Sequence, residues 1–218
     1  MPGRSPYLSS RCVVSTFKLN ARPLLNVIAT ESRSALEDAK VFPFFRMSDL
    51  PQNIPLLLLL MRCYNRDKQA FLLGNFYLRL IVNEVAMILG LPNRGRVLKF
   101  ARLPLLDFTH KNLIDELKML AEEQFSPNLE SRRVNALVKY LLVVFLFPLK
   151  GLKIPACLNE LGNLASFTQY NWPDVIHKFL HSNLTVLSRM SVIREFGSNL
   201  GYFEGCTTVL LVRVTLIR

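Results

Sequence analysis

Residues 84–92 read Glu-Val-Ala-Met-Ile-Leu-Gly-Leu-Pro, a short apolar helix followed directly by its own stop signal. Gly90 can adopt the left-handed backbone conformation that closes a helix, and Pro92 cannot continue one. Asn83 is the nearest side chain that can cap the first turn. This stretch predicts a helix over residues 83–89 with a defined end, and the neighbouring elements can be placed from it.

Upstream of this helix, the sequence predicts a hairpin and a buried helix. Gly74 and Asn75 separate two stretches rich in Phe, Leu, Ile, Val and Tyr, residues 70–73 and 76–82. A two-residue Gly-Asn loop is typical of a tight hairpin, because its backbone needs positive φ. The apolar run over residues 54–64, with a proline in its first turn, is typical of a buried helix.

Downstream, the hydrophobic periodicity predicts further helices. Thr109 is a candidate N-cap for the most clearly amphipathic of them. Residues 132–147 are apolar on nearly every face, which is typical of the central helix of a domain. A short helix is expected over residues 159–165, and Asn171 is a candidate cap for a longer one. The Thr and Val content of residues 207–217 favours a strand by propensity.

Composition indicates a folded domain with a basic leader. The 218 residues are 50% hydrophobic, with a mean hydropathy of +0.25, which excludes disorder throughout the chain. We expect residues 41–218 to form a single mainly-α, multi-helix globular domain with a small antiparallel β-hairpin. Residues 1–40 are expected to be poorly ordered, since no acidic residue precedes Glu31. This leader also has the composition of an organelle transit peptide, which keeps import into an organelle open as an alternative.

No pattern in the sequence indicates a metal, cofactor or membrane segment. The four cysteines form no CxxC pair, which indicates reduced thiols. His177 and His181 have the i, i+4 spacing of zinc ligands on a helix, but the HExxH carboxylate is missing. No glycine-rich phosphate loop is present, so we expect no cofactor. The apolar runs at residues 56–60 and 140–149 are well below the roughly 20 residues of a membrane span.

A basic segment follows the helix stop signal and is the candidate binding site. It combines four cations with an aromatic ring that can stack on a base: Arg94, Arg96, Lys99, Phe100 and Arg102. Cations that neutralise several phosphates give a salt-dependent affinity, and the net charge of +11 is compatible with a nucleic-acid partner. A solvated basic loop is the alternative. Arg132 and Arg133 form a second local concentration of positive charge.

Three more blocks follow residues 84–92 at long spacing. They are Phe147-Pro148 at the end of the central apolar helix, Tyr170-Asn171-Trp172 before the longer helix, and residues 202–206, Tyr-Phe-Glu-Gly-Cys, before the apolar C-terminus. In this order they make residues 40–217 resemble the plant mobile domain, a transposon-derived domain that is also called aminotransferase-like. The chain departs from the family at Ile81, where a Thr usually caps the helix, and at Arg213, where an apolar or aromatic residue is usual.

The resemblance implies a mostly helical, non-catalytic domain with nuclear roles in transposon silencing and genome maintenance. It implies a helix rather than a strand over residues 207–217. Trp172 is interpreted as a packing residue, because a lone Trp at a helix start usually anchors a core. We therefore predict a nuclear interaction module that associates with chromatin or nucleic acid through the basic segment. An apolar helix face left partly uncovered would bind an unknown protein partner.

Two alternatives remain at this point. A related domain precedes SUMO-protease-like regions in plant transposon proteins, so the chain could be an accessory domain whose catalytic region is absent. The apolar segment that runs to Arg218 indicates such a truncated product. A protease site needs a Gln a few residues before its Cys, and Cys206 has none, so we interpret Cys206 as a small buried thiol. An imported protein, cleaved at residues 25–40, is the other alternative.

Overall fold

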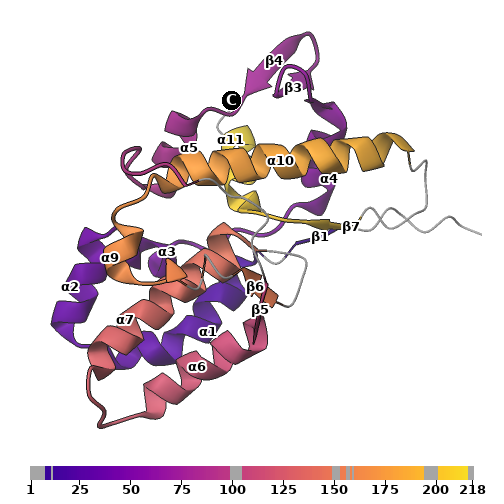
Figure 1. Ribbon diagram of the computed structural model, residues 1–218. Coiled ribbons are helices and arrows are strands. Elements are labelled where there is room, and N and C mark those ends of the chain that lie inside the picture. Colours follow the sequence, from indigo (N-terminus) through magenta and orange to yellow (C-terminus); the bar gives the residue numbers. More distant parts are fainter. Residues whose placement is uncertain are drawn as a thin grey trace, which may run out of the picture.

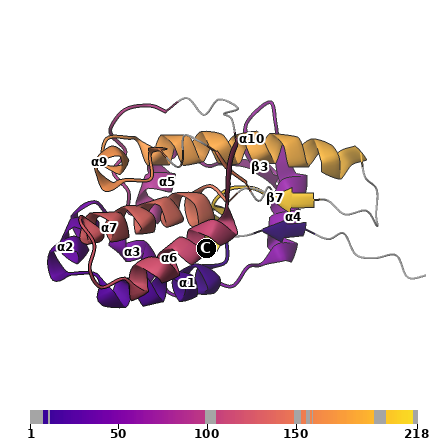
Figure 2. The same cartoon turned by 60° about the horizontal axis from the view of Figure 1, so that its bottom comes forward.

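The computed structural model describes residues 8–10, 12–98, 105–148, 153–155, 158, 160–193 and 201–215. These residues form a mainly-α fold with short strands, which confirms the fold class predicted from the sequence (Figure 1). The helices fall into two groups, and Figures 1 and 2 both show these groups packed beside one another.

The first group is a bundle around the central apolar helix. Its members are α1 (Val14–Val27), α2 (Thr30–Asp38), α3 (Phe42–Arg46), α6 (His110–Glu122), α7 (Leu129–Tyr140) and the π-helix η1 (Leu141–Leu146). α1 packs against α6 and α7, α6 packs against α7, and α2 packs against α3 and α7. The bundle therefore combines segments from both halves of the chain.

The central helix predicted over residues 132–147 is confirmed by α7 and η1 together. All side chains of η1 are buried except Val144, which is partly buried. The N–H of Phe147 donates to the carbonyl of Leu142 at 2.8 Å, which is the five-residue spacing of a π-helix. Pro148 follows and cannot extend the helix.

The second group carries the hairpin and the C-terminal helix. Its members are α4 (Ile54–Cys63), α5 (Val82–Leu89), α10 (Trp172–Ile193) and α11 (Thr207–Thr215), whereas the short helix α9 (Leu164–Phe167) packs against α7 of the first group. α10 and α11 each pack against both α4 and α5. The helix predicted over residues 159–165 is interrupted: residue 160 is helical, residues 161–163 are not, and α9 begins at Leu164. The helix expected over residues 207–217 is confirmed for residues 207–215, and residues 216 and 217 lie outside the described residues.

The predicted hairpin is present as part of a three-stranded antiparallel sheet. Strands β3 (Ala70–Leu73) and β4 (Phe76–Arg79) meet at Gly74, whose φ is +61°. The sequence analysis missed the third strand and two further strand pairs. These are β2 (Tyr64–Asn65) beside β3, β1 (Leu8–Ser10) parallel to β7 (Gly201–Phe203), and β5 (Leu105–Thr109) antiparallel to β6 (Lys153–Pro155).

The prediction of a poorly ordered leader over residues 1–40 is wrong for residues 12–40. Phe17, on α1, is 1% exposed and stacks on Tyr140 with ring centroids 5.1 Å apart, and Phe45 and Phe145 lie at 5.0 Å from it. α1 is thus part of the core, and cleavage at residues 25–40 would remove it. Local composition hid this helix because its stability comes from packing against distant segments rather than from its own polar pattern.

Helix ends follow the sequence signals in most places. Gly90 closes α5 with φ +65°, and Thr109 caps α6 by accepting from the N–H of Asn112 at 3.3 Å. The expected capping of α5 by Asn83 is wrong. Instead, the carboxylate of Glu84 accepts from the N–H of Ile81 at 3.2 Å, and its other oxygen accepts from Arg213 at 2.7 Å. The cation at position 213 therefore docks α11 onto the first turn of α5.

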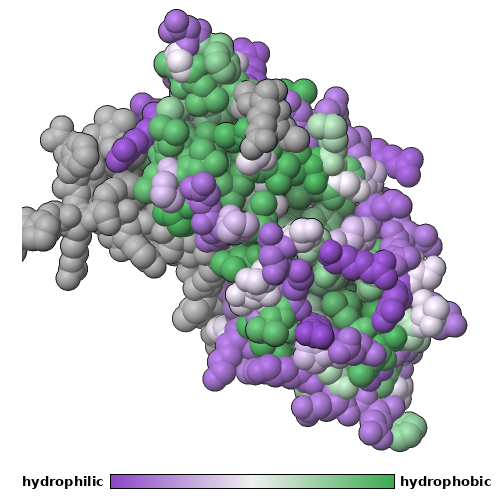
Figure 3. All heavy atoms as spheres, turned by 180° about the vertical axis from the view of Figure 1, so that it is seen from behind, coloured by the Kyte–Doolittle hydropathy of each residue, from purple (hydrophilic) through white to green (hydrophobic). Residues whose placement is uncertain are grey.

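The surface is uneven in polarity. Seen from behind, apolar side chains gather on the upper part of the molecule, around the hairpin (Figure 3). Leu72, Phe76 and Ile81 are among the exposed large apolar residues there. In the part of the chain that the structure describes, no helix has the length and apolar character needed to cross a membrane.

Candidate interaction site

The loop that carries Arg94 and Arg96 is fixed by its backbone. The N–H of Arg96 donates to the carbonyl of Gln169 at 2.8 Å, and the N–H of Asn171 donates to the carbonyl of Arg96 at 3.0 Å. Arg96 and Tyr170 thus form a parallel bridge. Two sequence blocks that lie some 80 residues apart, residues 84–92 and 170–172, are brought to the two sides of one junction.

Gly95 makes this close approach possible. Its φ is +118°, a conformation that side chains rarely adopt, and a Cβ atom there would lie 2.7 Å from the carbonyl oxygen of Gln169. The atoms that a side chain would meet belong to the backbone and cannot rotate away. The glycine between the two arginines therefore allows the loop to dock, a role that no local sequence pattern indicated.

Three asparagine side chains connect the loop to the starts of two helices. Asn171 donates from its amide to Asn93 Oδ1 at 2.9 Å, and Asn93 donates in turn to Asn83 Oδ1. The other side-chain atom of Asn171, Oδ1, accepts from the N–H of Asp174 at 3.2 Å, which confirms its predicted role as the cap of α10. The side chain of Asn83 is thus used to hold the loop rather than to cap α5.

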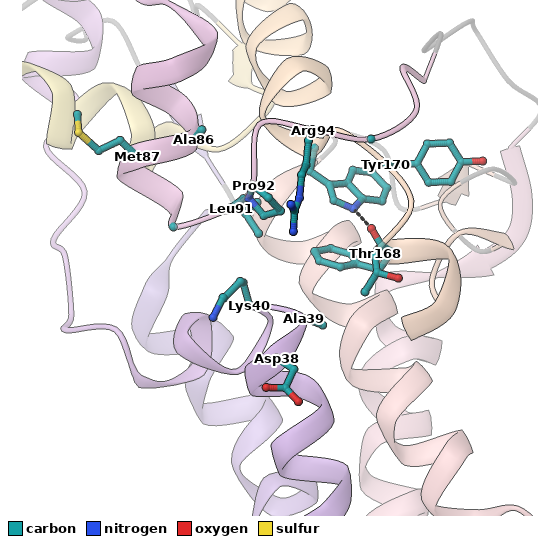
Figure 4. A pocket seen from close by; sticks show the side chains of 14 residues that line it. Asp38, Ala39, Lys40, Ala86, Met87, Leu91, Pro92, Arg94, Thr168 and Tyr170 are labelled. Atoms are coloured by element: carbon teal, nitrogen blue, oxygen red, sulfur yellow. Dashed lines mark hydrogen bonds between the residues drawn. The ribbon is translucent and has the colours of Figure 1, made fainter.

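A cavity of about 760 Å³ opens beside this junction (Figure 4). It lies between the end of α2, the end of α5, the loop and the segment before α10. Its lining residues are Asp38, Ala39, Lys40, Ala86, Met87, Gly90, Leu91, Pro92, Arg94, Gly95, Phe167, Thr168, Tyr170 and Trp172. Both sequence blocks that meet at the junction therefore line the cavity, together with the end of α2.

Trp172 forms part of the apolar wall of the cavity. It is 2% exposed, its ring stacks on Phe167 with centroids 5.2 Å apart, and its Nε1 donates to the carbonyl of Phe167 at 2.7 Å. The polar atom of the indole is satisfied and its faces are covered. The interpretation of Trp172 as a packing residue is confirmed.

The cavity lining contains two cations, Arg94 on the loop and Lys40 at the end of α2, while Arg96 lies on the same loop outside the lining. Arg94 and Arg96 are exposed, and so is Lys40 at the end of α2. Among the residues that the structure describes, none of these three is in an ion pair with a carboxylate. Lys40 was missed by the sequence analysis, because nothing in the local pattern links it to residue 94. Of the other predicted site residues, Lys99, Phe100 and Arg102 lie outside the described residues.

The second basic cluster is used inside the fold. Arg133 is 8% exposed and donates to the carbonyls of Leu120 at 3.0 Å, Glu123 at 2.7 Å and Val27 at 3.2 Å. It also pairs with the carboxylate of Glu130 at 2.7 Å.

Glu130 completes this network. Its carboxylate accepts from the N–H of Ala29 and the hydroxyl of Ser32, each at 2.9 Å, at the start of α2. Burial alone would raise the pKa of Glu130, but these hydrogen bonds and Arg133 outweigh it and lower that pKa. The neighbouring Arg132 pairs with Glu123 at 2.9 Å.

The two histidines with zinc-like spacing make other bonds. The Nε2 atoms of His177 and His181 both donate to the carbonyl of Leu80, at 2.8 and 3.4 Å. Nδ1 of His181 therefore accepts from the hydroxyl of Tyr64, at 2.7 Å. Burial, reinforced by the nearby His177, lowers the pKa of His181 from 6.5 to about 4.

The thiol of Cys206 is buried beside a second thiol. A hydrogen bond from Cys206, with others from Thr208 and Thr207, lowers the pKa of Cys12 to about 7 although burial opposes this shift. Burial raises the pKa of Cys206 well above its ordinary value, which disfavours the thiolate that a nucleophile needs. The interpretation of Cys206 as a small buried thiol is confirmed, since its exposure is 0%.

Comparisons with models of known protein families, with curated proteins and with solved structures find no match to this chain. The resemblance to the plant mobile domain stays a prediction.

Proposed function

We propose that this protein is a non-catalytic, nuclear interaction module of transposon origin that binds nucleic acid through the basic segment that begins at Arg94. The observation that carries the proposal is the state of Arg94 and Arg96. Both are exposed on a loop whose backbone is pinned to residues 169–171, and neither is paired with a carboxylate in the described part of the chain. Cations on a pinned loop can contact phosphates without the entropic cost of ordering the backbone.

The experiment is a salt titration of binding. Fluorescence anisotropy measures the affinity for a labelled DNA, single-stranded and duplex, at several salt concentrations. Reversing three charges, Arg94→Glu, Arg96→Glu and Lys99→Glu, should weaken binding and flatten the slope of log K against log salt by about 2 to 3. A slope that stays unchanged removes this segment from the proposed function.

A matched control separates the site from the overall charge. Arg22, Lys111 and Lys118 are exposed on α1 and α6, and reversing all three lowers the net charge by the same amount. The control should lose less affinity than the loop variant, because it changes only the long-range field. Equal losses would show that binding reflects net charge alone. Circular dichroism of both variants establishes that the fold is retained.

A further inference from the structure

We propose that the cavity beside the loop binds the phosphorylated end of a nucleic acid strand, as a single nucleotide that carries a terminal phosphate monoester. This inference rests on the proposed function and names the part of the nucleic acid that the site takes. The cavity has a volume of about 760 Å³, which falls in the range of roughly 300–1,000 Å³ that is typical of small-molecule sites.

Charge selects an anion for this cavity. Arg94 reaches into it from the loop and Lys40 approaches from the end of α2 (Figure 4). Asp38 is the one carboxylate among the lining residues, and Figure 4 shows it on the far side of Lys40 from Arg94. Two cations on facing walls match a terminal phosphate monoester, which carries about −1.5 to −2 charges at pH 7, better than an internal diester with a single charge.

The backbone of Lys40 is in a conformation that a lysine rarely adopts. Its φ is +61°, and its N–H donates to the carbonyl of Glu37 at 3.0 Å while that of Val41 donates to Leu36 at 2.9 Å. These two bonds are typical of a helix C-terminus, and they place Lys40 at the position that glycine usually occupies there. A lysine there costs conformational free energy, and its ammonium group at the cavity mouth is the property that a glycine would lack.

The remaining wall selects a partly apolar ligand. Met87, which is 70% exposed, and the exposed Pro92 contribute apolar surface to the lining. Inorganic phosphate would leave this wall in contact with water, whereas a nucleotide places a base or sugar against it. Because Arg94 belongs to both the loop and the cavity, a strand held along the loop can place its end there.

The test compares oligonucleotides that differ only at their ends. Single-stranded DNA of one sequence carries a 5′-phosphate, a 3′-phosphate or neither, and anisotropy gives each affinity. One phosphorylated end should bind about tenfold more tightly than the unphosphorylated strand, the effect of one hydrogen bond to a charged group. Equal affinities for all three would overturn the inference and leave the proposed function standing. Absence of salt-dependent binding to any of them would overturn both.

Lys40→Gly separates binding from folding. The variant should lose the preference for the phosphorylated end, yet raise the midpoint of thermal unfolding by about 2–4 °C because glycine suits the positive φ. Gln69→Gly is the matched control, since Gln69 has φ +47° and lies outside the cavity. It should stabilise the protein and keep the preference. Retention of the preference in Lys40→Gly contradicts the inference.

A phosphopeptide is the competing ligand. A short peptide with one phosphotyrosine carries the same phosphate monoester and a ring. If it displaces the phosphorylated strand while a nucleoside monophosphate does not, the cavity belongs to a phosphoprotein and the inference is overturned. Displacement by the nucleoside monophosphate alone supports it.

Discussion

The two arginine clusters of this protein look alike in sequence and differ in the fold. Arg133 lies at the corner between α6 and α7, where it is buried and donates to three carbonyls and a carboxylate. Arg94 and Arg96 lie on the loop after α5, where the backbone is bonded and the guanidinium groups are left exposed. One cluster holds helices together, and the other is free to meet a ligand.

Arg133 differs from Arg94 and Arg96 because its guanidinium group bonds to carbonyls at the ends of helices. The last carbonyls of a helix have no partner within it. Val27 ends α1, and Leu120 and Glu123 lie at the end of α6, so Arg133 supplies donors to carbonyls that have no partner within their own helices. At Arg96 the main chain, and not the guanidinium group, bonds to Gln169 and Asn171. A count of cations therefore does not reveal which of them are available for binding.

The largest effect on stability is expected from the removal of Arg133, which joins α6 and α7. Arg133→Ala should lower the free energy of unfolding by about 3–5 kcal/mol, because three carbonyls lose a charged donor and Glu130 loses its ion pair. The adjacent Arg132→Ala should cost at most about 1 kcal/mol, since its pair with Glu123 is on the surface. Urea denaturation of both variants measures this. Equal losses would mean that Arg133 is no more structural than its neighbour.

Lowering the pH tests how much the buried, neutral His181 contributes to the free energy of unfolding. The folded pKa of His181, about 4, lies below the unfolded value of 6.5, so the unfolded state binds more protons between these pH values. Stability should therefore fall by about 3 kcal/mol as the pH drops from 6.5 to 4. The lowered pKa of Glu130 adds a loss at still lower pH.

His181→Gln identifies the source of this acid sensitivity. The variant should flatten the dependence of unfolding free energy on pH between 6.5 and 4, whatever its stability at neutral pH. His177→Gln should flatten this dependence less, because burial contributes more than His177 to the lowered pKa of His181. A slope that persists in His181→Gln would assign the sensitivity to another group.

The smallest effect on stability is expected at the loop. Gly95→Ala should cost about 1–3 kcal/mol, because the new Cβ meets the backbone of Gln169 and the φ of +118° is unfavourable for alanine. Gly74→Ala is the control, since its φ is also positive but nothing lies within 4 Å of the added atom. The difference between the two variants, measured by thermal unfolding, reports the close approach together with the greater strain of φ +118° relative to φ +61°. No difference would show that the loop moves aside readily.

Sequence by itself determined the elements whose signals are local. Gly90 ends α5, Thr109 caps α6 and Asn171 caps α10, because each of these bonds joins residues close in the chain. The Gly74 turn and the apolar central helix were found for the same reason. These signals were enough to predict a mainly-α domain with a hairpin.

Tertiary structure alone decided what depends on distant contacts. α1 has no side-chain cap and holds a proline, so its place in the core comes from the stacking of Phe17 on Tyr140. Lys40 and Arg94 line one cavity although 54 positions separate them, and Arg133 is buried because the ends of α1 and α6 converge on it. Hydrogen bonding and burial across the fold assign these roles, since a side chain's availability depends on which unpaired groups the packing brings to it.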